Sequence, residues 1–238
     1  MSIQSDQIFI MKRILFFCMM IWNLLFGSQA QAQDWANREY YAQANIELQS
    51  RGADPKRVVL MGNSITEFWM ETHPQFFADH NLVGRGISGQ VSSQMLARFR
   101  QDVLNLQPRV VVINCGTNDI AENNGPYDEE ITIDNILSMA ELGLHNGITV
   151  VLSSVLPTDH FIWNPSVKDV PAKVVSLNRR IVDLAQRLSL PYIDYYSVMV
   201  VPGTGAINPA FSDDGVHPNP TGYDVMEKQL LETLEKLH

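Results

Sequence analysis

Cysteine is scarce in this chain, and its scarcity limits how the fold can be held together. The 238 residues include only two cysteines, Cys18 and Cys115. Cys18 falls in an N-terminal apolar segment that we expect to be removed. Cys115 then has no partner, which excludes a fold stapled by internal disulfides. Stability must come from a hydrophobic core, for which 45% hydrophobic residues over this length are ample.

Positive charge is also in short supply. The chain has 17 Lys and Arg residues against 26 Asp and Glu, a formal net charge of -9. No block of basic residues occurs, and nucleic-acid backbones are bound by clustered Lys and Arg, so a nucleic-acid partner is not indicated.

A run long enough to span a membrane is missing as well. The apolar segment ILFFCMMIWNLLFG covers residues 14–27, whereas a membrane-spanning helix needs about 20 residues. It follows the basic pair Lys12-Arg13 and precedes Ala30-Gln31-Ala32. This order predicts a secretory signal peptide over 1–32, cut after Ala32; a membrane anchor is the alternative. We expect 33–238 to be exported, periplasmic or secreted, with no stable membrane span.

The remaining chain alternates between strand and helix patterns. Short apolar, β-branched runs predict buried strands, and longer segments with helical spacing of apolar residues follow them. Such alternation predicts a single three-layer α/β/α doubly wound domain, with about five parallel strands and helices on both faces. The expected strands are 57–62, 82–84, 109–116, 148–157 and 190–196, and the expected helices are 34–50, 91–106, 128–145, 171–188 and 220–237.

Distinctive polar stretches follow several of these strands. Ligands bind at the carboxyl ends of the strands in such sheets, so the stretches should meet at one rim. Each taken alone is a plausible turn. Together they bring a serine, glycine amides, an asparagine and an Asp-x-x-His pair to one place. The stretches are Gly62-Asn63-Ser64, GRGISGQ (84–90), GTND (116–119) and SDDGVHPN (212–219).

This set of groups suits acyl transfer without a cofactor. A serine hydroxyl needs a neighbouring base, and histidine titrates near neutrality. A carboxylate on the other imidazole nitrogen fixes the tautomer, and Asp214 lies three residues before His217. The Ser64 N–H, the Gly89 N–H and the Asn118 side-chain amide could stabilise a developing oxyanion.

The blocks GNSIT, GRGISGQ, GTND and DGVHP, in this order, resemble the signature blocks of the SGNH hydrolases, also called the GDSL esterase/lipase family. The resemblance spans about 57–237 and implies a flavodoxin-like sheet. It implies that Ser64 is the nucleophile and that His217 is the base with Asp214 as its partner. Gly89 and Asn118 would complete the oxyanion hole, with Gly86 as the alternative glycine.

Three positions depart from familiar patterns. Asn63 stands where the family's first block has aspartate, and its side chain can still bond locally in a turn. Thr66 occupies the place of the second glycine of Gly-x-Ser-x-Gly, so the nucleophile elbow of α/β-hydrolases is not indicated. Arg85 stands in the second block, where the family often has other residues. It is either a substrate contact or a solvated loop residue.

Competing assignments exist around the same rim. His160 follows Asp159 after the fourth strand and rivals His217 as the base. Because adjacent side chains tend to point apart, we interpret that loop as a pocket wall, with His160 and Trp163 as candidate substrate contacts. A metal site built from Asp213, Asp214 and His217 is the other alternative. No further clustered ligands at metal spacing support it, so no metal is expected.

These features predict an exported serine carboxylic-ester hydrolase that works through an acyl-enzyme. Its partner would be a small-molecule ester or an acylated glycan, with a short acyl group such as acetyl on carbohydrate. A lysophospholipase or platelet-activating-factor-type acetylhydrolase is the alternative within enzymes. A non-catalytic glycan-binding module is the alternative outside them. The sequence gives no indication of the oligomeric state.

Overall fold

The computed structural model describes residues 34–237, so the predicted signal peptide lies outside the described part of the chain. From Trp35 onward these residues form one compact unit. Its centre is a five-stranded parallel sheet with the strand order β2-β1-β3-β4-β5. This is the flavodoxin-like order, so the predicted doubly wound fold is confirmed. The strands are β1 (Val58–Gly62), β2 (Leu82–Gly86), β3 (Val110–Ile113), β4 (Thr149–Ser153) and β5 (Tyr192–Ile193).

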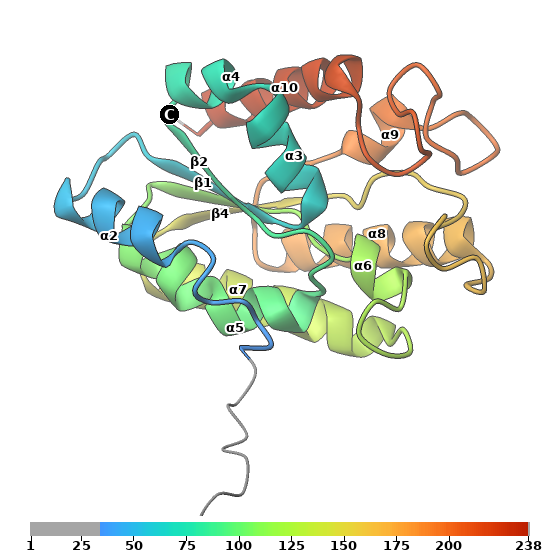
Figure 1. Ribbon diagram of the computed structural model, residues 1–238, viewed down its shortest axis with the longest axis horizontal. Helices are drawn as coiled ribbons and strands as arrows, with labels where there is room; N and C mark the ends of the chain where they lie inside the picture. The colour runs from blue at the N-terminus through green and yellow to red at the C-terminus, as the bar shows by residue number, and fades with distance from the viewer. Residues whose placement is uncertain (1–33, 238) are drawn as a thin grey trace, which may run out of the picture. The chain divides into compact units, whose positions relative to one another are not determined.

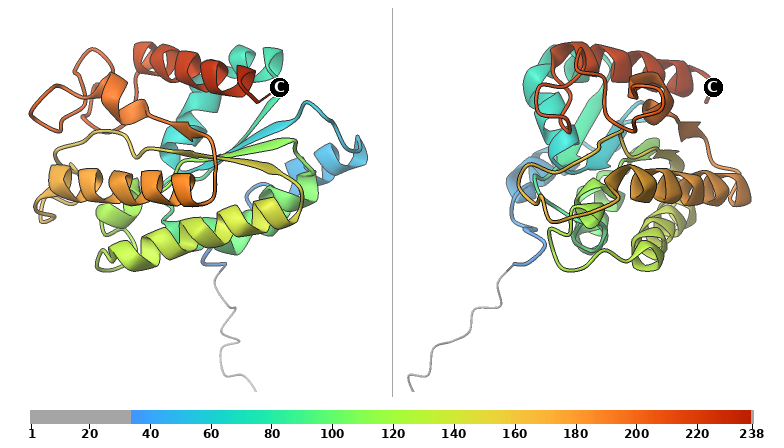
Figure 2. Two further views of the ribbon diagram at one scale, coloured as in Figure 1. Left: turned by 180° about the vertical axis from the view of Figure 1, so that it is seen from behind. Right: turned by 90° about the vertical axis from the view of Figure 1, so that its right-hand side faces the viewer.

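Helices cover both faces of the sheet (Figures 1 and 2). One face carries α5 (Ser92–Asp102), α7 (Glu129–His145) and α8 (Val170–Arg187). The other carries α3 (Ser64–Thr72), α4 (Pro74–Asp79), α9 (Tyr195–Met199) and α10 (Pro220–Glu235). The remaining helices are α2 (Ala42–Ser50), η1 (Leu104–Leu106) and α6 (Thr117–Ile120).

Alternation along the strands explains why they are apolar throughout. Val59 and Met61 of β1 pack into the core beneath α5, α7 and α8. Val58 and Leu60, their neighbours, pack into the core beneath α3, α4 and α10. Side chains of a strand point alternately to its two faces, so a sheet covered on both faces needs apolar residues at every position.

The ends of some elements differ from the prediction. The helix expected over 34–50 begins only at Ala42, and Asn37 has a positive φ of 50° that a right-handed helix cannot contain. The fifth strand has only two residues, because Pro191 before it has no N–H for a ladder bond and Asp194 after it caps α9. Helices α4, α6 and α9 were not predicted, since six residues or fewer are too short to show a helical period.

None of the helices in residues 34–237 combines the length and hydrophobicity required to cross a bilayer.

Candidate active site

Ser64 stands at the carboxyl edge of the sheet, where β1 ends and α3 begins. It is the first residue of α3, and Asn63 caps the helix by accepting a hydrogen bond from the Ile65 N–H at 3.0 Å. The asparagine therefore still performs the local turn function expected of it. The Ser64 side chain is largely buried, with its hydroxyl at the N-terminus of a helix.

His217 and Asp214 come from the loop between α9 and α10. The Ser64 Oγ lies 2.9 Å from the His217 Nε2, and the His217 Nδ1 lies 2.7 Å from the Asp214 Oδ2. The other carboxylate oxygen, Asp214 Oδ1, accepts the backbone N–H groups of Val216 and His217, both at 2.8 Å. The three predicted residues thus form a continuous Ser–His–Asp chain of hydrogen bonds.

Two opposing effects act on the pKa of Asp214. Partial burial tends to raise it, but the hydrogen bonds from the His217 side chain and from the His217 and Val216 backbone together outweigh burial. The pKa of Asp214 consequently lies below its ordinary value. Asp214 is therefore ionised at neutral pH and can hold His217 in the tautomer whose Nε2 faces Ser64 as an acceptor.

Three N–H donors border the same space. Neither the Ser64 N–H nor the Gly89 N–H has a hydrogen-bond acceptor within the described residues. Asn118 donates one amide hydrogen to the Gln90 carbonyl at 3.0 Å and accepts from Asn123 at 3.0 Å. These two bonds fix which way the Asn118 amide faces and leave its second hydrogen free. Preorganised donors of this kind are what an oxyanion requires.

A pocket of about 270 Å³ joins these groups. Phe68 and Trp163 form its aromatic part, with ring centroids 5.3 Å and 6.0 Å from that of His217. The Trp163 indole N–H donates to the Asn123 side chain at 2.8 Å, which fixes the ring beside the pocket. The lining residues are Ser64, Phe68, Ser88, Gly89, Asn118, Asn123, Trp163 and His217.

Gly89, and not Gly86, borders this pocket. Gly89 has a φ of +76°, a conformation that suits glycine. Gly86 lies inside β2, paired with Gly62, and a Cβ there would clash with the backbone of Asn63 and Glu67. The glycine at 86 thus allows the first turn of α3 to approach the sheet closely. The structure places the oxyanion alternative Gly86 in a packing position.

Arg85 also lies elsewhere than expected, since it neither contacts the pocket nor reaches solvent. Its side chain is 3% exposed, and its Nε donates to the Asn45 side chain at 3.0 Å. The guanidinium lies 4.6 Å from the centre of the Tyr41 ring. The position of Arg85 in β2 directs its side chain into the protein, so the proposed substrate contact and the solvated-loop alternative are both wrong.

His160 does not compete with His217 for Ser64. Its Nδ1 is 2.6 Å from the Asp159 carboxylate, so the expectation that these adjacent side chains point apart is wrong. The pair is well exposed, with 56% and 46% of the side chains accessible. The His160 ring packs against Gly215, within the loop that carries Asp214. His160 therefore supports the outside of that loop and does not line the pocket.

One cluster of potential metal ligands among the described residues lies outside the pocket. His73, Asp224 and Glu227 place ligand atoms within 4.8 Å of one another. The His73 Nδ1 is 2.6 Å from the Glu227 Oε1, which also accepts from Trp69 at 3.2 Å. Ligands around tetrahedral zinc are about 3.3 Å apart, given bond lengths of about 2.0 Å. The His73–Glu227 separation is shorter than this ligand–ligand distance and is that of a hydrogen bond. The cluster is therefore a hydrogen-bonded contact between the end of α3 and α10.

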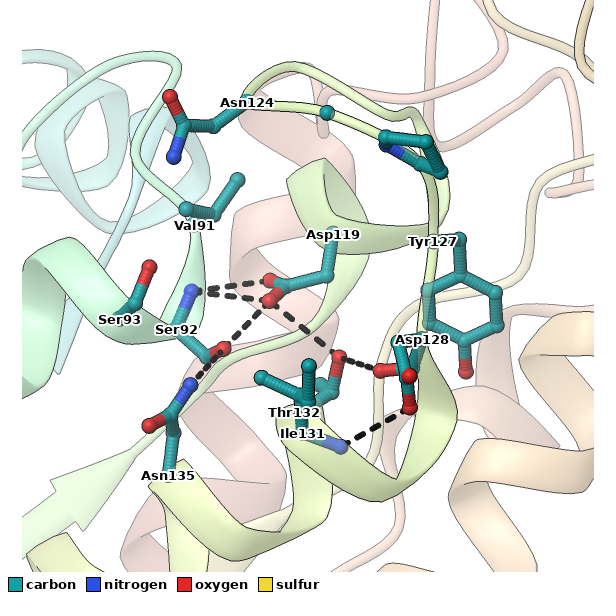
Figure 3. Close-up of a pocket in the computed structure, with 12 residues that line it drawn as sticks. Val91, Ser92, Ser93, Asp119, Asn124, Tyr127, Asp128, Ile131, Thr132 and Asn135 are labelled. Atoms are coloured by element: carbon teal, nitrogen blue, oxygen red, sulfur yellow. Dashed lines mark hydrogen bonds between the residues drawn. The ribbon is translucent and has the colours of Figure 1, made fainter.

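A second pocket, of about 150 Å³, is lined by Asp119, the residue that follows Asn118 in the chain (Figure 3). Asp119 faces it and accepts hydrogen bonds from the Ser92 N–H and hydroxyl at the start of α5. It is also 3.4 Å from the Thr132 hydroxyl on α7. Burial raises the pKa of Asp119, and these hydrogen bonds counteract that increase. The residue ties α6 to its neighbours and so holds the adjacent Asn118 in place.

Two lining residues, Ser88 and Asn123, were not predicted from the sequence. Phe68, an aromatic residue that the sequence allows either in the pocket or in structural packing, lies one turn after Ser64 on α3 and lines the pocket. Ser88 directly precedes Gly89 in the second block. Asn123 reaches the pocket from a loop whose course depends on the folded structure, and no local motif marks it.

The site is a hydrogen-bonded series of a serine, a histidine and an aspartate. It lies at the carboxyl edge of a flavodoxin-like sheet. This combination is characteristic of the SGNH hydrolases. The comparison with protein families agrees. The model of the GDSL-like lipase/acylhydrolase family matches residues 60–225, and the chain belongs to this family. The predicted resemblance is thereby confirmed.

Two solved structures are similar over most of the chain. A protein assigned as an acylhydrolase from Bacteroides fragilis NCTC 9343 is 53% identical, with a TM-score of 0.83, covering 86% of this chain and 99% of that one. A GDSL-like lipase from Bacteroides thetaiotaomicron VPI-5482 is 50% identical, with a TM-score of 0.81, covering 85% and 99%.

A curated relative extends the comparison to a characterised type of activity. It is an acetylxylan esterase from Xylanibacter ruminicola, 26% identical over an alignment 204 residues long that covers 71% of this chain. The match spans 41% of that relative's length, so the relative is much the longer protein. Family membership and these similarities support hydrolysis of esters as the class of activity.

Proposed function

We propose that the chain is an exported serine esterase that removes short acyl groups, such as acetyl, from carbohydrate. The observation that carries the proposal is the Ser64–His217–Asp214 series, with separations of 2.9 Å and 2.7 Å, beside unpaired N–H donors in one pocket. A serine so arranged has a base to accept its proton and donors to stabilise the oxyanion.

The mechanism follows from these positions. The Ser64 Oγ attacks the ester carbonyl while its proton passes to the His217 Nε2, and Asp214 stabilises the resulting imidazolium. The carbonyl oxygen becomes an oxyanion and is stabilised by the N–H groups of Ser64 and Gly89 and the Asn118 amide. The imidazolium protonates the departing alcohol oxygen as the C–O bond breaks. Water then attacks the acyl-enzyme in the same way, which releases the acid and regenerates Ser64.

The aromatic residues of the pocket support a carbohydrate substrate. Trp163 and Phe68 are 46% and 37% exposed, and they flank His217. Flat, exposed rings beside a polar site suit the apolar face of a sugar. The activity of the Xylanibacter ruminicola relative, named for acetylated xylan, supports the same choice. Aromatic rings also suit a lipid tail, so a lysophospholipase-type activity is the second candidate.

Hydrolysis of p-nitrophenyl esters from acetate to laurate, by residues 33–238, tests the proposal. We expect turnover that is fastest for acetate, falls as the acyl chain lengthens, and is lost in Ser64→Ala. The control is Ser50→Ala, which removes an exposed hydroxyl at the end of α2. Activity that rises towards laurate would favour the lipid candidate. Ester hydrolysis that persists in Ser64→Ala would refute the proposed mechanism.

Export is a separate part of the proposal, and it rests on the pattern of residues 1–32. Expression of the full chain followed by N-terminal sequencing of the exported protein is the test. We expect the exported chain to begin at Gln33. A chain that stays in the cytoplasm with its N-terminal segment intact would contradict export.

A further inference from the structure

Glu67 lies beneath the loop that carries Gly89. It follows Ser64 by three positions on α3, which places it in the first turn of that helix. The residue is only 7% exposed, and it is not among the pocket-lining residues. A buried carboxylate is costly unless hydrogen bonds replace its hydration, so the partners of Glu67 indicate its role.

Three donors converge on this carboxylate. Its Oε2 accepts the Ser88 N–H at 2.7 Å and also the Ser88 hydroxyl. Its Oε1 accepts the Tyr40 hydroxyl. This hydrogen bond is the main cause that raises the pKa of Tyr40 to about 12, so Tyr40 remains a donor at neutral pH. Two of the three bonds thus hold a single loop residue, and the third holds Glu67 itself.

The held residue directly precedes the predicted oxyanion donor. The next N–H along the chain after that of Ser88 belongs to Gly89. Its φ is +76°, but a residue without a Cβ can adopt several other backbone conformations that would direct this N–H elsewhere. Fixing both the N–H and the hydroxyl of Ser88 restricts the peptide that follows. Charge-assisted bonds are about twice as strong as neutral ones, which suits a carboxylate to this purpose.

We infer that Glu67 is a positioning residue that keeps the Gly89 N–H directed at the oxyanion. The inference rests on the proposed function, because it assumes that Ser64 forms a tetrahedral intermediate. Glu67 and Ser64 share the first turn of α3, so this residue couples the oxyanion loop to the helix that carries the nucleophile. Tyr40, from the segment before α2, holds the second oxygen of the carboxylate.

The test compares Glu67→Ala, Glu67→Gln and the control Glu71→Ala, which alters an exposed residue one turn further along α3. A donor that is misdirected loses part of the 10²–10³-fold contribution of an oxyanion donor. We therefore expect kcat for p-nitrophenyl acetate to fall about 10- to 100-fold in Glu67→Ala, with KM changed less than about threefold. Glu67→Gln keeps one acceptor oxygen for Ser88 and should recover most of the loss.

A tetrahedral mimic separates positioning from general damage to the fold. Boron in phenylboronic acid takes up the Ser64 Oγ as a ligand while the hydroxyl proton passes to His217, so a boron-bound oxygen occupies the oxyanion position. We expect its inhibition constant in Glu67→Ala to rise by the same factor as kcat falls. An unchanged inhibition constant in Glu67→Ala would overturn the inference. An unchanged kcat would overturn it too, as would a rise in KM by the same factor as the fall expected in kcat.

Two further measurements keep the test decisive. If Glu67→Ala does not fold, the double variant Tyr40→Phe with Ser88→Ala removes two of the three donors, and an unchanged kcat in that variant overturns the inference. Ser64→Ala is measured alongside. An inactive Ser64→Ala with a fully active Glu67→Ala refutes the role of Glu67 alone, whereas an active Ser64→Ala refutes the proposed function itself.

Discussion

The Ser64 hydroxyl and the His217 imidazole are 2.9 Å apart although 153 positions separate the two residues in the chain. The packing of α3 against α10 sets this distance, since Ser64 begins α3 and His217 lies just before α10. The Tyr223 hydroxyl on α10 donates to the Ile65 carbonyl on α3 at 2.9 Å, and Trp69 stacks on the Tyr223 ring at 5.7 Å. The contact between Ser64 and His217 is therefore a product of core packing.

Replacing Asn118 with alanine should remove one of the proposed oxyanion donors. The Asn118 amide borders the pocket, and two hydrogen bonds fix its orientation. We expect Asn118→Ala to lower kcat by about 10²–10³-fold with a small change in KM, because the lost bond forms in the transition state. Steady-state kinetics with p-nitrophenyl acetate measure this, and Asn124→Ala, at an exposed neighbouring position, is the control. Equal losses in the two variants would contradict the assignment.

Replacing Asp214 with asparagine should affect both catalysis and acid stability. In the Ser-His-Asp template the equivalent change lowers kcat about 10⁴-fold because the tautomer is wrong, and we expect a loss of this order. The folded-state pKa of Asp214 is lowered, so its contribution to stability is complete above the unfolded pKa, about 3.9. That contribution is lost as pH falls through the folded pKa.

Urea unfolding of the native chain and Asp214→Asn between pH 7 and pH 3 checks the stability part. The gap between the two midpoints should stay constant above about pH 5 and narrow below about pH 4. Asp213→Asn, which alters an exposed neighbour in the same loop, is the control and should show no such narrowing. A gap that widens towards low pH would mean that Asp214 has a raised pKa.

Alanine at Gly86 and at Gly89 should have different consequences. At Gly86 the new Cβ meets the backbone of Glu67 and Asn63, and such overpacking typically costs about 1–3 kcal/mol. At Gly89 the nearest atom to a Cβ is the Asn123 Nδ2 at 3.9 Å, but the positive φ costs an L-residue about 1–2 kcal/mol. Both variants should therefore lower the unfolding midpoint. Gly89→Ala should in addition lower kcat, because a backbone that relaxes from the positive φ turns the Gly89 N–H away from the oxyanion, whereas Gly86→Ala should change kcat less. The reverse pattern would restore Gly86 as the oxyanion donor.

Much of this site could be predicted because its residues follow strands in short local motifs. Ser64, Asn118 and the Asp214–His217 pair each lie directly after or between regular elements, and a parallel sheet gathers its carboxyl ends at one edge. Arg85 could not be placed correctly, since whether a strand residue points inward depends on pairing and register. The role of Glu67 could not be predicted, because its hydrogen-bond donors are Tyr40 and Ser88, which only the folded chain brings together.

Replacing Arg98, which does not line the Ser64 pocket, should destabilise the protein. Arg98 is fully buried on α5, and its Nη1 is 2.9 Å from the Asp102 carboxylate. Its Nη2 donates to the Gly62 and Arg85 carbonyls at the ends of β1 and β2, at 2.9 Å and 3.0 Å. Removing one partner leaves the Asp102 carboxylate buried without its counter-ion, so Arg98→Leu should lose about 3–5 kcal/mol of unfolding free energy.

The double variant Arg98→Leu with Asp102→Leu shows whether the unpaired charge is the cause. Deleting both ions removes the uncompensated carboxylate, so the double variant should lose less than the sum of the two single variants. Asp102 also accepts from the Asn45 side chain at 2.6 Å, and the Gly62 and Arg85 carbonyls still lose their hydrogen bonds from Arg98, so recovery should be partial. Arg100→Leu, at an exposed position of α5, is the control for loss of a charge alone. Additive losses in urea unfolding would show that the lost carbonyl bonds at the strand ends, and not the buried charge, dominate the effect.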